Sequence, residues 1–535
     1  MALLSASSAA ATAMTAASRK LLPKVIIDLI DPDIIIGNPT SSGQLSVSLM
    51  DQLYNKVRIG DTKYATGELN RWILDGTWQI FPDNPSAEVG EIGYIGDVIS
   101  NADGIYTTRP WVQLNISGIH ELQASSVAFT GLEADGYGVD FTFSVYSGNT
   151  VGYTQTITSN TDQLVAFEGF TVTSPTAIRI TFSKWSLPGR HPRAVEIIPG
   201  VYEEWTEHQI YTVSIKNEVD LSCMSLPYGT CTLEIWNKDK RFNPRNKNSI
   251  FQSIEEREKV PTTLGIRIPS GAFEYLPTGT YFQQNGGWAT GHNGMTMLFN
   301  LIDIIGLTAN RKYAPPGTLP TTVDGWVQSI VSQLGNNFSA YYIIDNNMAN
   351  TALTCTPDDV SNIKCGDLLR FVCMAINAFP RADATTGYLR VSKVPASGGI
   401  TITFDNMSAW PIQKANDAVA SITFKIYDST DNNQYIVSGT TPAAEQTLSV
   451  SNPFIHTTAQ ADVVAANILK YYGGQQYQIK GRGNLRSEMG DVDAANVDPD
   501  YTGSGWRYYQ ELGLNSKGIM SDVASYLLQS SGLLK

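Results

Sequence analysis

The chain has 535 residues, of which only 16% are charged, and its 50 acidic residues outnumber 37 basic ones to give a formal net charge of −13. This length exceeds a single hydrophobic core and indicates three or four domains of about 150 residues each. The acidic balance argues against nucleic-acid binding, which needs a basic surface, and no apolar run is long enough for a membrane-spanning helix.

The N-terminal segment is rich in small residues. Residues 1–18 contain eight Ala and four Ser, and the first positive charges follow at Arg19 and Lys20. A secretory signal carries its charges before a leucine-rich stretch, so this reversed order argues against a signal peptide. We expect residues 1–19 to form a short helical or flexible arm that leads into the first strand.

Strand patterns dominate the chain after this arm. Residues 24–30 form a run rich in β-branched side chains, and residues 44–49 alternate apolar and polar side chains as a half-buried antiparallel strand does. Helical periodicity is rarer and predicts helices at 323–334, 367–378 and 457–472. The expected fold class is therefore mainly β with α+β parts.

Catalytic and metal-binding motifs are absent from the sequence. The five His are far apart, and no phosphate-binding loop, Cys-x-x-Cys pair or nucleophile elbow occurs. Glu203 and Glu204 would point to opposite faces of a strand, so they do not form the converging carboxylate pair of a glycosidase. We therefore predict no enzyme, no cofactor and no metal.

Two further groups of residues leave alternatives open. Cys223 and Cys231 flank a turn and could face each other, either as a reduced buried pair or as a disulfide or metal site. The acidic run 490–500 lacks the central Gly and terminal Glu of a calcium loop. We interpret it as a solvated loop, with a weak cation site as the alternative.

Residues 53–202 are interpreted as an inserted β-sandwich, or jelly roll. The segment contains Pro-Trp-Val-Gln-Leu at 110–114, Ile-Arg-Ile at 178–180 and a closing Glu-Ile at 196–197 after a loop with Trp and Arg. These elements resemble the core strands of the discoidin, or coagulation-factor type-C, family of galactose-binding-like jelly rolls. The bracketing cysteines of secreted members are absent, so their disulfide cannot form here.

The resemblance implies that loops at one end of the sandwich bind glycans or lipid headgroups. Such a site needs an aromatic face for the sugar ring and polar side chains for its hydroxyls. The candidate glycan-binding residues are Trp72, Trp78, Asp83, Asn84, Trp185, Arg190, His191 and Arg193. The alternative is structural: Trp111 and Arg179 belong to the core and scaffold, and the Trp185 loop packs against the parent domain.

The segments that flank this insert resemble a second family. Trp-Asn-Lys-Asp-Lys-Arg-Phe-Asn-Pro-Arg-Asn at 236–246, Asn-Pro-Phe at 452–454 and the hairpin at 481–491 follow one another as in the hub and tail-tip proteins of tailed bacteriophages. Leu485 stands where the family prefers Pro, so that turn differs. The resemblance covers the chain outside the inserted module.

This second resemblance implies two β-barrel domains that mimic the subunits of a tail tube. Three chains would then form a homotrimeric ring with pseudo-sixfold symmetry, bound to tail-tube and distal tail proteins on one side and to tip, spike or fibre proteins on the other. The predicted domains are an arm (1–19), a first hub barrel (20–52 plus 203–312), the inserted sandwich (53–202), a mixed α/β domain (313–400) and a second hub barrel (401–535) that includes the helix 457–472.

The implied function is that of a structural virion protein at the distal tail or baseplate, assembled in the host cytoplasm. Its acidic wall would line the DNA channel without stable nucleic-acid binding, since it repels phosphate. The inserted module would sit at the periphery and could bind host surface glycans. The alternative is a carbohydrate-active or adhesin-type cell-surface protein, which the missing carboxylate pair and export signal disfavour.

Overall fold

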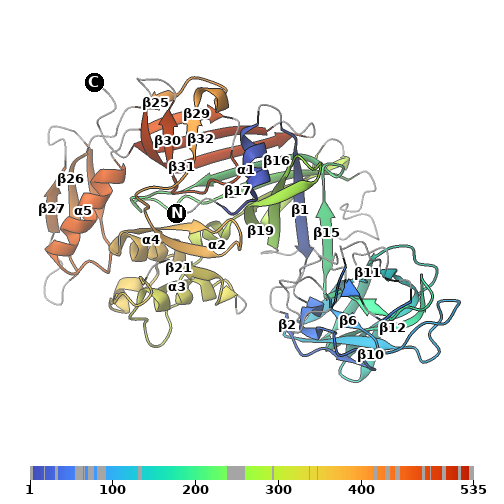
Figure 1. Cartoon of the computed structure of the whole chain (residues 1–535). Coiled ribbons are helices and arrows are strands. Elements are labelled where there is room, and N and C mark those ends of the chain that lie inside the picture. Colours follow the sequence, from blue (N-terminus) through green and yellow to red (C-terminus); the bar gives the residue numbers. More distant parts are fainter. Residues whose placement is uncertain are drawn as a thin grey trace. The chain divides into compact units, whose positions relative to one another are not determined.

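The chain divides into two compact units (Figure 1). Unit 1 consists of Met1–Ile26, Glu204–Asp239 and Lys259–Lys535, and unit 2 consists of Ile27–Glu203 and Lys240–Glu258. The computed structural model describes residues 4–16, 19–29, 34–54, 64–65, 67–69, 71, 78–80, 92–129, 135–237, 259–291, 294–335, 338–345, 347–414, 419–427, 434–439, 446–472, 476–481, 484–496, 502–515 and 520–528.

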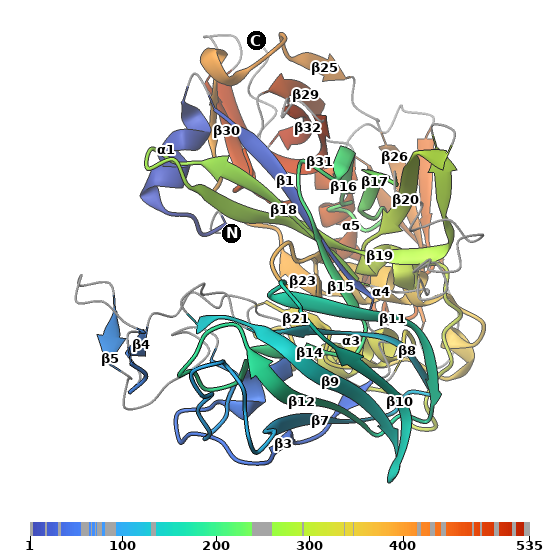
Figure 2. The same cartoon turned by 90° about the vertical axis from the view of Figure 1, so that its right-hand side faces the viewer.

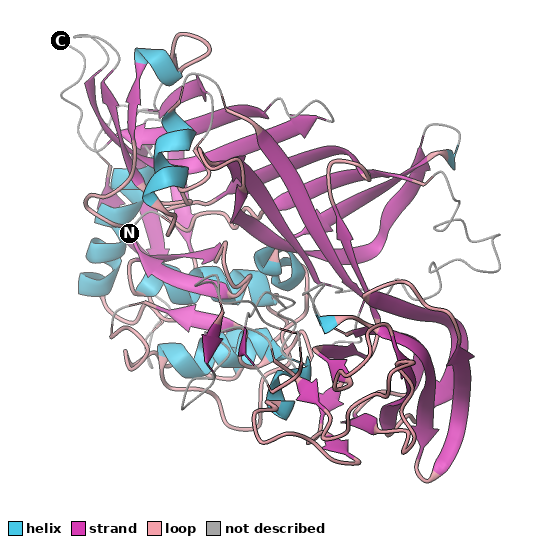
Figure 3. Cartoon of the chain, turned by 45° about the vertical axis from the view of Figure 1, so that its right-hand side comes forward, coloured by secondary structure: helices cyan, strands magenta, loops and turns pink. Residues whose placement is uncertain are grey.

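A sheet of 13 strands forms the framework of unit 1, and its long strands are magenta in Figure 3. The main path runs, in spatial order, through β15 (Val201–Trp205), β1 (Leu21–Leu29), β18 (Lys259–Arg267), β19 (Phe273–Gly291), β20 (Thr296–Ile302), β17 (Thr230–Trp236), β16 (Ile210–Glu218), β31 (Thr502–Asn515), β32 (Met520–Leu528), β29 (Gln476–Gly481) and β25 (Ile412–Lys414). Off this path, β30 (Val492–Asn496) pairs with β31 and with β24 (Thr401–Thr403).

The expectation of two closed barrels is wrong for the described strands, none of whose sheets closes into a barrel. Strand β16 pairs antiparallel with β31, from Thr212 opposite Asn515 to Glu218 opposite Tyr509. The other edge of β16 pairs with β17. Because both edges of β16 are used, strands from both predicted barrels join in one continuous sheet. We call this β16–β31 ladder the seam.

A helical subdomain packs beside the sheet within unit 1. It contains α2 (Ile304–Ala309), α3 (Val323–Ser332), α4 (Cys365–Ala375), the short helix η7 (Asp358–Val360) and a sheet of β21 (Tyr342–Ile344), β23 (Leu389–Lys393) and β22 (Ala378–Ala382). Helix α3 begins at Thr322, whose side chain caps it by accepting from the Gly325 amide. Its buried face includes Trp326 and Ile330, which belong to one core cluster with Val372 of α4.

The C-terminal part of unit 1 adds helix α5 (Thr458–Tyr472), which contacts a small sheet of β27 (Gln434–Ser438), β26 (Val419–Lys425) and β28 (Gln446–Val450). The short helix η8 (Phe404–Asn406) follows β24, and helix α1 (Ser8–Thr15) forms the N-terminal arm. The three predicted helices are confirmed as α3, α4 and α5, with ends displaced by at most three residues. No described helix is long and apolar enough to cross a membrane.

Unit 2 contains two sheets packed face to face (Figure 2). The larger has β10 (Thr150–Ile157), β9 (Gly138–Ser147), β12 (Ala177–Trp185), β7 (Trp111–Ser117), β2 (Ile35–Ile36) and β3 (Thr40–Ser41). The smaller has β11 (Leu164–Thr173), β8 (Glu121–Ala128) and β14 (Glu196–Ile198). Short pairs are formed by β6 (Tyr94–Ile95) with β13 (Arg193–Ala194) and by β4 (Tyr64–Ala65) with β5 (Gln79–Ile80), and η1 (Met50–Tyr54) is a short helix.

Aromatic side chains fill the space between these two sheets. Phe141, Phe143 and Val145 alternate along β9 and are fully buried. The ring of Phe143 stacks on Phe167 of β11, with centroids 3.9 Å apart. This contact crosses from one sheet to the other, so period-two burial on β9 builds the sandwich core.

Two sequence predictions differ from the observed strands near residue 40. Residues 44–49 form no strand; Gln44 makes only an isolated bridge to Gly96, and a turn follows. Strands β2 and β3 pair with β7, so this part of the segment assigned to the first barrel belongs to unit 2. The strand predicted at 24–30 is confirmed as β1.

Candidate functional site

The residues predicted to bind glycans fall into two groups. Trp185, Arg190, His191 and Arg193 are buried, with exposed fractions of 1%, 7%, 8% and 3%. Trp78 is half-buried, and the guanidinium of Arg71 lies over its ring at 5.3 Å from the centroid. Trp72, Asp83 and Asn84 lie outside the described residues.

Arg193 belongs to a buried network of two acids and two arginines in unit 2. Its Nη2 donates to Glu68 Oε2 at 2.5 Å and its Nη1 to Oε1 at 3.1 Å. Arg71 donates from Nη2 to Asp135 Oδ2 at 2.9 Å, and its Nε contacts Oδ1. Burial alone would lower the pKa of Arg193, but Asp135 and Glu68 raise it above its ordinary value. The guanidinium of Arg193 therefore stays charged at neutral pH.

The neighbouring predicted residues hold this network in place. Trp185 donates from Nε1 to the backbone oxygen of Asp135 at 2.6 Å, and the His191 amide donates to Glu68 Oε1 at 2.9 Å. Burial lowers the pKa of His191 below its ordinary value, so its ring is neutral at pH 7. These side chains fill the interior of unit 2, and glycan binding by them stays a prediction.

Trp111 and Arg179, which the sequence assigns to core and scaffold, are both half-buried on the outer face of the larger sheet. The guanidinium of Arg179 lies 4.2 Å from the centroid of Trp111 and 4.9 Å from that of Tyr146. Its Nε donates to Gln113 Oε1 at 2.8 Å. The guanidinium of Arg179 therefore covers faces of the Trp111 and Tyr146 rings, and a sugar that stacks on an aromatic ring needs such a face to be open.

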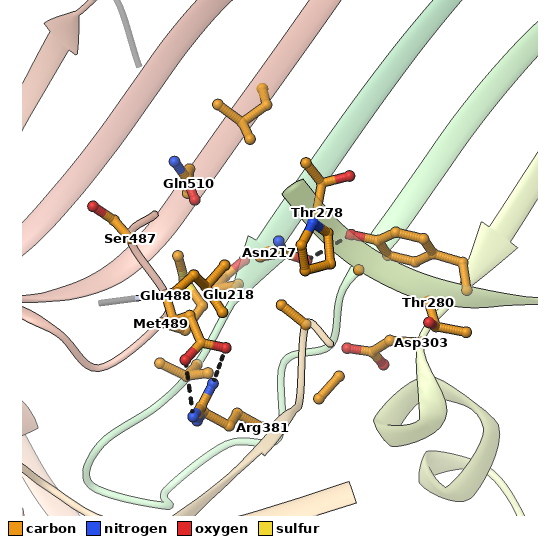
Figure 4. Close-up of a pocket in the computed structure, with 18 of the residues that line it drawn as sticks. Asn217, Glu218, Thr278, Thr280, Asp303, Arg381, Ser487, Glu488, Met489 and Gln510 are labelled. Carbon is orange, nitrogen blue, oxygen red and sulfur yellow. Dashed lines mark hydrogen bonds and ion pairs between the residues drawn. The ribbon is translucent and has the colours of Figure 1, made fainter. Parts of the chain in front are cut away.

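In unit 1, a cavity of about 50 Å³ lies at the seam (Figure 4). Its walls include Asn217 of β16, Gln510 of β31 and Arg381 of β22, so it lies where the two halves of the sheet meet the helical subdomain. A buried water needs about 10–15 Å³, whereas small-molecule pockets start near 300 Å³. The cavity therefore fits a few waters rather than a substrate.

Paired polar groups line this cavity (Figure 4). Arg381 donates from Nη1 to Glu488 Oε1 at 2.8 Å and from Nη2 to Oε2 at 3.3 Å, and both side chains are at least nine-tenths buried. Tyr281 donates its hydroxyl proton to Asn217 Oδ1 at 3.0 Å. This bidentate ion pair connects β22 to the loop before β30, so its role is structural.

Among the acids that line the cavity, Asp303 has a strongly raised pKa. It caps α2, because its Oδ1 accepts from the Gly306 amide at 2.8 Å and its Oδ2 from the Gly229 amide at 2.6 Å. Burial raises its pKa to about 7, against the lowering effect of these backbone hydrogen bonds. The carboxyl therefore exchanges its proton near neutral pH.

Asp303→Asn is expected to flatten the pH dependence of stability between about pH 4 and 7. The folded protein keeps a proton that the unfolded chain loses in this window, because the folded pKa is about 7 and the ordinary value is 3.8. The free energy of unfolding of the wild type therefore falls as pH rises, by up to about 4 kcal/mol at about 1.4 kcal/mol per pH unit. Urea unfolding at several pH values measures this slope. The exposed Asp358→Asn should keep it, and an unchanged slope in Asp303→Asn would contradict the assignment.

The acidic run 490–500 is not a solvated loop in its first half. Asp491 and Asp493 are 0% and 2% exposed, and residues 497–500 lie outside the description. Arg507 of β31 donates to Asp493 Oδ2 from Nε at 2.9 Å and from Nη2 at 2.6 Å. Burial raises the pKa of Asp491 to about 6. An arginine on the next strand, invisible to local sequence patterns, explains why Asp493 is buried, and Asp491 Oδ2 accepts from the Glu488 amide at 2.9 Å.

The five cysteines are free thiols, and four of them are buried. Cys223 and Cys231 are buried free thiols that do not face each other as proposed: Cys231 lies opposite Ile215 in the β16–β17 ladder, and the Cys223 sulfur contacts the backbone oxygen of Ala378 at 3.2 Å. Burial raises the pKa of Cys231 to about 12, so its thiol is unreactive at neutral pH. The described residues also contain no group of three or more potential metal ligands.

Comparison with known proteins finds likeness in structure only. No protein-family model matches the sequence, and no curated protein matches it. Similar solved structures include a tail protein from Neisseria meningitidis MC58 (12% identity, 62% of this chain and 94% of that one, TM-score 0.44). They also include a 43 kDa tail protein of prophage MuSo2 from Shewanella oneidensis (12%, 62% and 95%, 0.40) and prophage tail protein gp18 from Listeria monocytogenes EGD-e (7%, 61% and 92%, 0.37). At these values of identity and TM-score, the likeness assigns no function to this chain.

Proposed function

We propose that this chain is a structural component of a bacteriophage tail, a hub that joins the tail tube to the proteins of the tip. The observation that carries the proposal is the seam. It joins the sheet strands of the N-terminal half to those of the C-terminal half in a single sheet. A scaffold that must present two tube-like surfaces in a fixed relation needs such a rigid connection.

The assembly that we propose is a ring of three chains. Each chain would present two sheet segments, so three chains present six and match a hexameric tube in number. The seam fixes the two segments by main-chain hydrogen bonds along seven residue pairs, from Thr212 to Glu218. Ring contacts would remove further surface from water, which suits a chain with only 16% charged residues.

The charge of the chain supports a role around DNA without binding it. A formal net charge of −13 repels phosphate and offers no gain from counterion release. We also propose a structural rather than enzymatic role, because the acids at the seam are used in a helix cap and an ion pair. Carbohydrate binding by unit 2 stays a prediction.

The trimer is tested by native mass spectrometry of the purified full chain over a range of concentrations. We expect a species of three copies, and rings with threefold averages in negative-stain micrographs. Leu512→Asp, which places a charge at the buried seam opposite Ile215, should abolish the ring. Leu164→Asp, at a half-exposed position of unit 2, should leave it intact. A chain that stays monomeric at every concentration, alone and with tail-tube protein, would overturn the proposal.

A further inference from the structure

A cavity of unit 1 lies between the N-terminal helix α1 and the C-terminal strands of the large sheet. Its volume is about 340 Å³, which reaches the range of small-molecule pockets, roughly 300–1,000 Å³. Helix α1 lines it with Ala11 and Met14, and the strands line it with Ile402 of β24, Ile479 of β29 and Tyr526 of β32. Protein interiors are close-packed and hold few voids larger than a water molecule, so this cavity is a candidate binding site.

Polar contacts hold α1 beside this cavity. The amide and hydroxyl of Ser7 donate to the two carboxylate oxygens of Glu274, at 2.8 and 2.5 Å. The Leu4 amide donates to the backbone oxygen of Arg486 at 2.9 Å, and Arg486 Nε donates back to the Leu4 oxygen at 3.1 Å. These contacts fix the start of the arm, so the cavity is a defined feature of the fold.

The strand side of the cavity is apolar. It is formed by one hydrophobic cluster, whose members are each 3–7% exposed: Ile402, Ile479, Ala524 and Tyr526. Water beside an apolar surface is poorly ordered, and an apolar group that displaces such water gains affinity. This side of the cavity therefore favours an apolar occupant over water.

The arginines that line the cavity are already engaged by oxygens of the chain itself. Arg19 donates from Nη1 to the backbone oxygen of Met14 at 3.0 Å, and Arg486 donates from Nε to the arm as described above. Arg507 donates from Nη2 to Asp493 Oδ2 at 2.6 Å and is 1% exposed. Because these contacts hold the guanidinium groups, the lining does not require an anion, and a charged ligand would lose its hydration on entry. The lining therefore favours a neutral ligand.

We propose that this cavity binds a neutral molecule with an apolar body and one polar end, such as a straight-chain alcohol. The apolar body would lie between Met14 of α1 and the side chains of Ile402 and Ile479. The polar end would lie toward Asn484 and Arg486, which line the cavity and are half-buried, so water still reaches them. A second polar group at the opposite end would be buried against hydrocarbon and would weaken binding.

Isothermal titration calorimetry of the full chain compares n-octanol with the octanediol that has a hydroxyl at each end. We expect n-octanol to bind at least about tenfold more tightly, a difference of about 1.4 kcal/mol, because the second hydroxyl of the diol loses its water at the apolar side. Octanoate, which would lose the hydration of its charge, should bind no more tightly than n-octanol. Equal binding of alcohol and diol, tighter binding of octanoate, or no binding of n-octanol would overturn the proposal.

Variants that fill the cavity locate the site. Ala11→Leu enlarges an apolar side chain of the lining from α1 and should weaken n-octanol binding at least about tenfold, and Ala524→Leu tests the same from β32. Ala13→Leu is the matched control and should bind as the wild type does, since Ala13 lies on the same helix outside the lining and Leu has nearly the helix propensity of Ala.

Hydrogen exchange of the full chain gives a second, local readout. Bound n-octanol should slow exchange of the α1 amides in the wild type and in Ala13→Leu, but not in Ala11→Leu. Undiminished binding to both filling variants would place the ligand elsewhere and overturn the proposal. These measurements do not depend on the trimer, so this proposal and the proposed function fail separately.

Discussion

Arg193→Met is expected to destabilise unit 2 by about 3–5 kcal/mol, because it removes one of the two guanidinium groups that contact the buried carboxylates of Glu68 and Asp135. The side chain of Glu68 is 0% exposed and receives two hydrogen bonds from Arg193. Water cannot replace this partner at such burial, so removal of the guanidinium costs much more than loss of a surface ion pair.

Hydrogen exchange of the β12 and β13 amides in the full chain would measure this loss where it arises. Arg179→Met is the matched control, since Arg179 is half-buried on the outer face and stacks on two rings. Its removal should cost about 1 kcal/mol. The double variant Glu68→Gln/Arg193→Met should recover part of the stability. If Arg193→Met costs no more than Arg179→Met, the network does not stabilise the unit as described.

Arg507→Met is expected to cost a similar 3–5 kcal/mol in unit 1. Arg507 and Asp493 are each 1% exposed in their side chains, and both Nε and Nη2 of the arginine donate to one carboxylate oxygen. The arginine also lies over the ring of Tyr526, 5.5 Å from its centroid. Its removal leaves the carboxyl of Asp493 in the interior without this guanidinium.

Chemical denaturation, followed by hydrogen exchange of β30 and β31, would give this value. Adding Asp493→Val to Arg507→Met should restore most of the stability, because an apolar pair of similar volume often replaces a buried ion pair at little cost. The exposed Arg267→Met should change the free energy of unfolding by less than about 0.5 kcal/mol. A double variant as unstable as Arg507→Met alone would show that the unpaired charge is not the cause.

The elements that the sequence predicts well are those whose signals are local. Helix α3 has apolar residues at helical spacing and a Thr cap, and the strands β7, β12 and β17 alternate with period two. The seam has no such signal. The alternation of β16 shows that its two faces differ, but it does not show whether its edge pairs with a strand of the same barrel or with β31, far along the chain.

The contacts of the candidate side chains are likewise not visible in local sequence patterns. A Trp near an Arg-rich loop fits both a sugar platform and a core residue, and the sequence shows neither the burial of Trp185 nor its Nε1 contact with the Asp135 oxygen. In the run 490–500, the closely spaced acidic residues suggest a loop that is exposed to solvent. The register of β30 on β31 instead brings Asp493 near Arg507, so charge pairing across strands decides the burial.

The placement of β1 and β15 side by side allows the segment between them to be exchanged. The chain leaves for unit 2 at the end of β1 and returns at the start of β15, and these strands are neighbours in the sheet. Neighbouring strands lie about 4.8 Å apart, a gap that a short turn can bridge. The segment between them can therefore be replaced as a cassette by recombination, while the sheet that carries it keeps every other strand pairing.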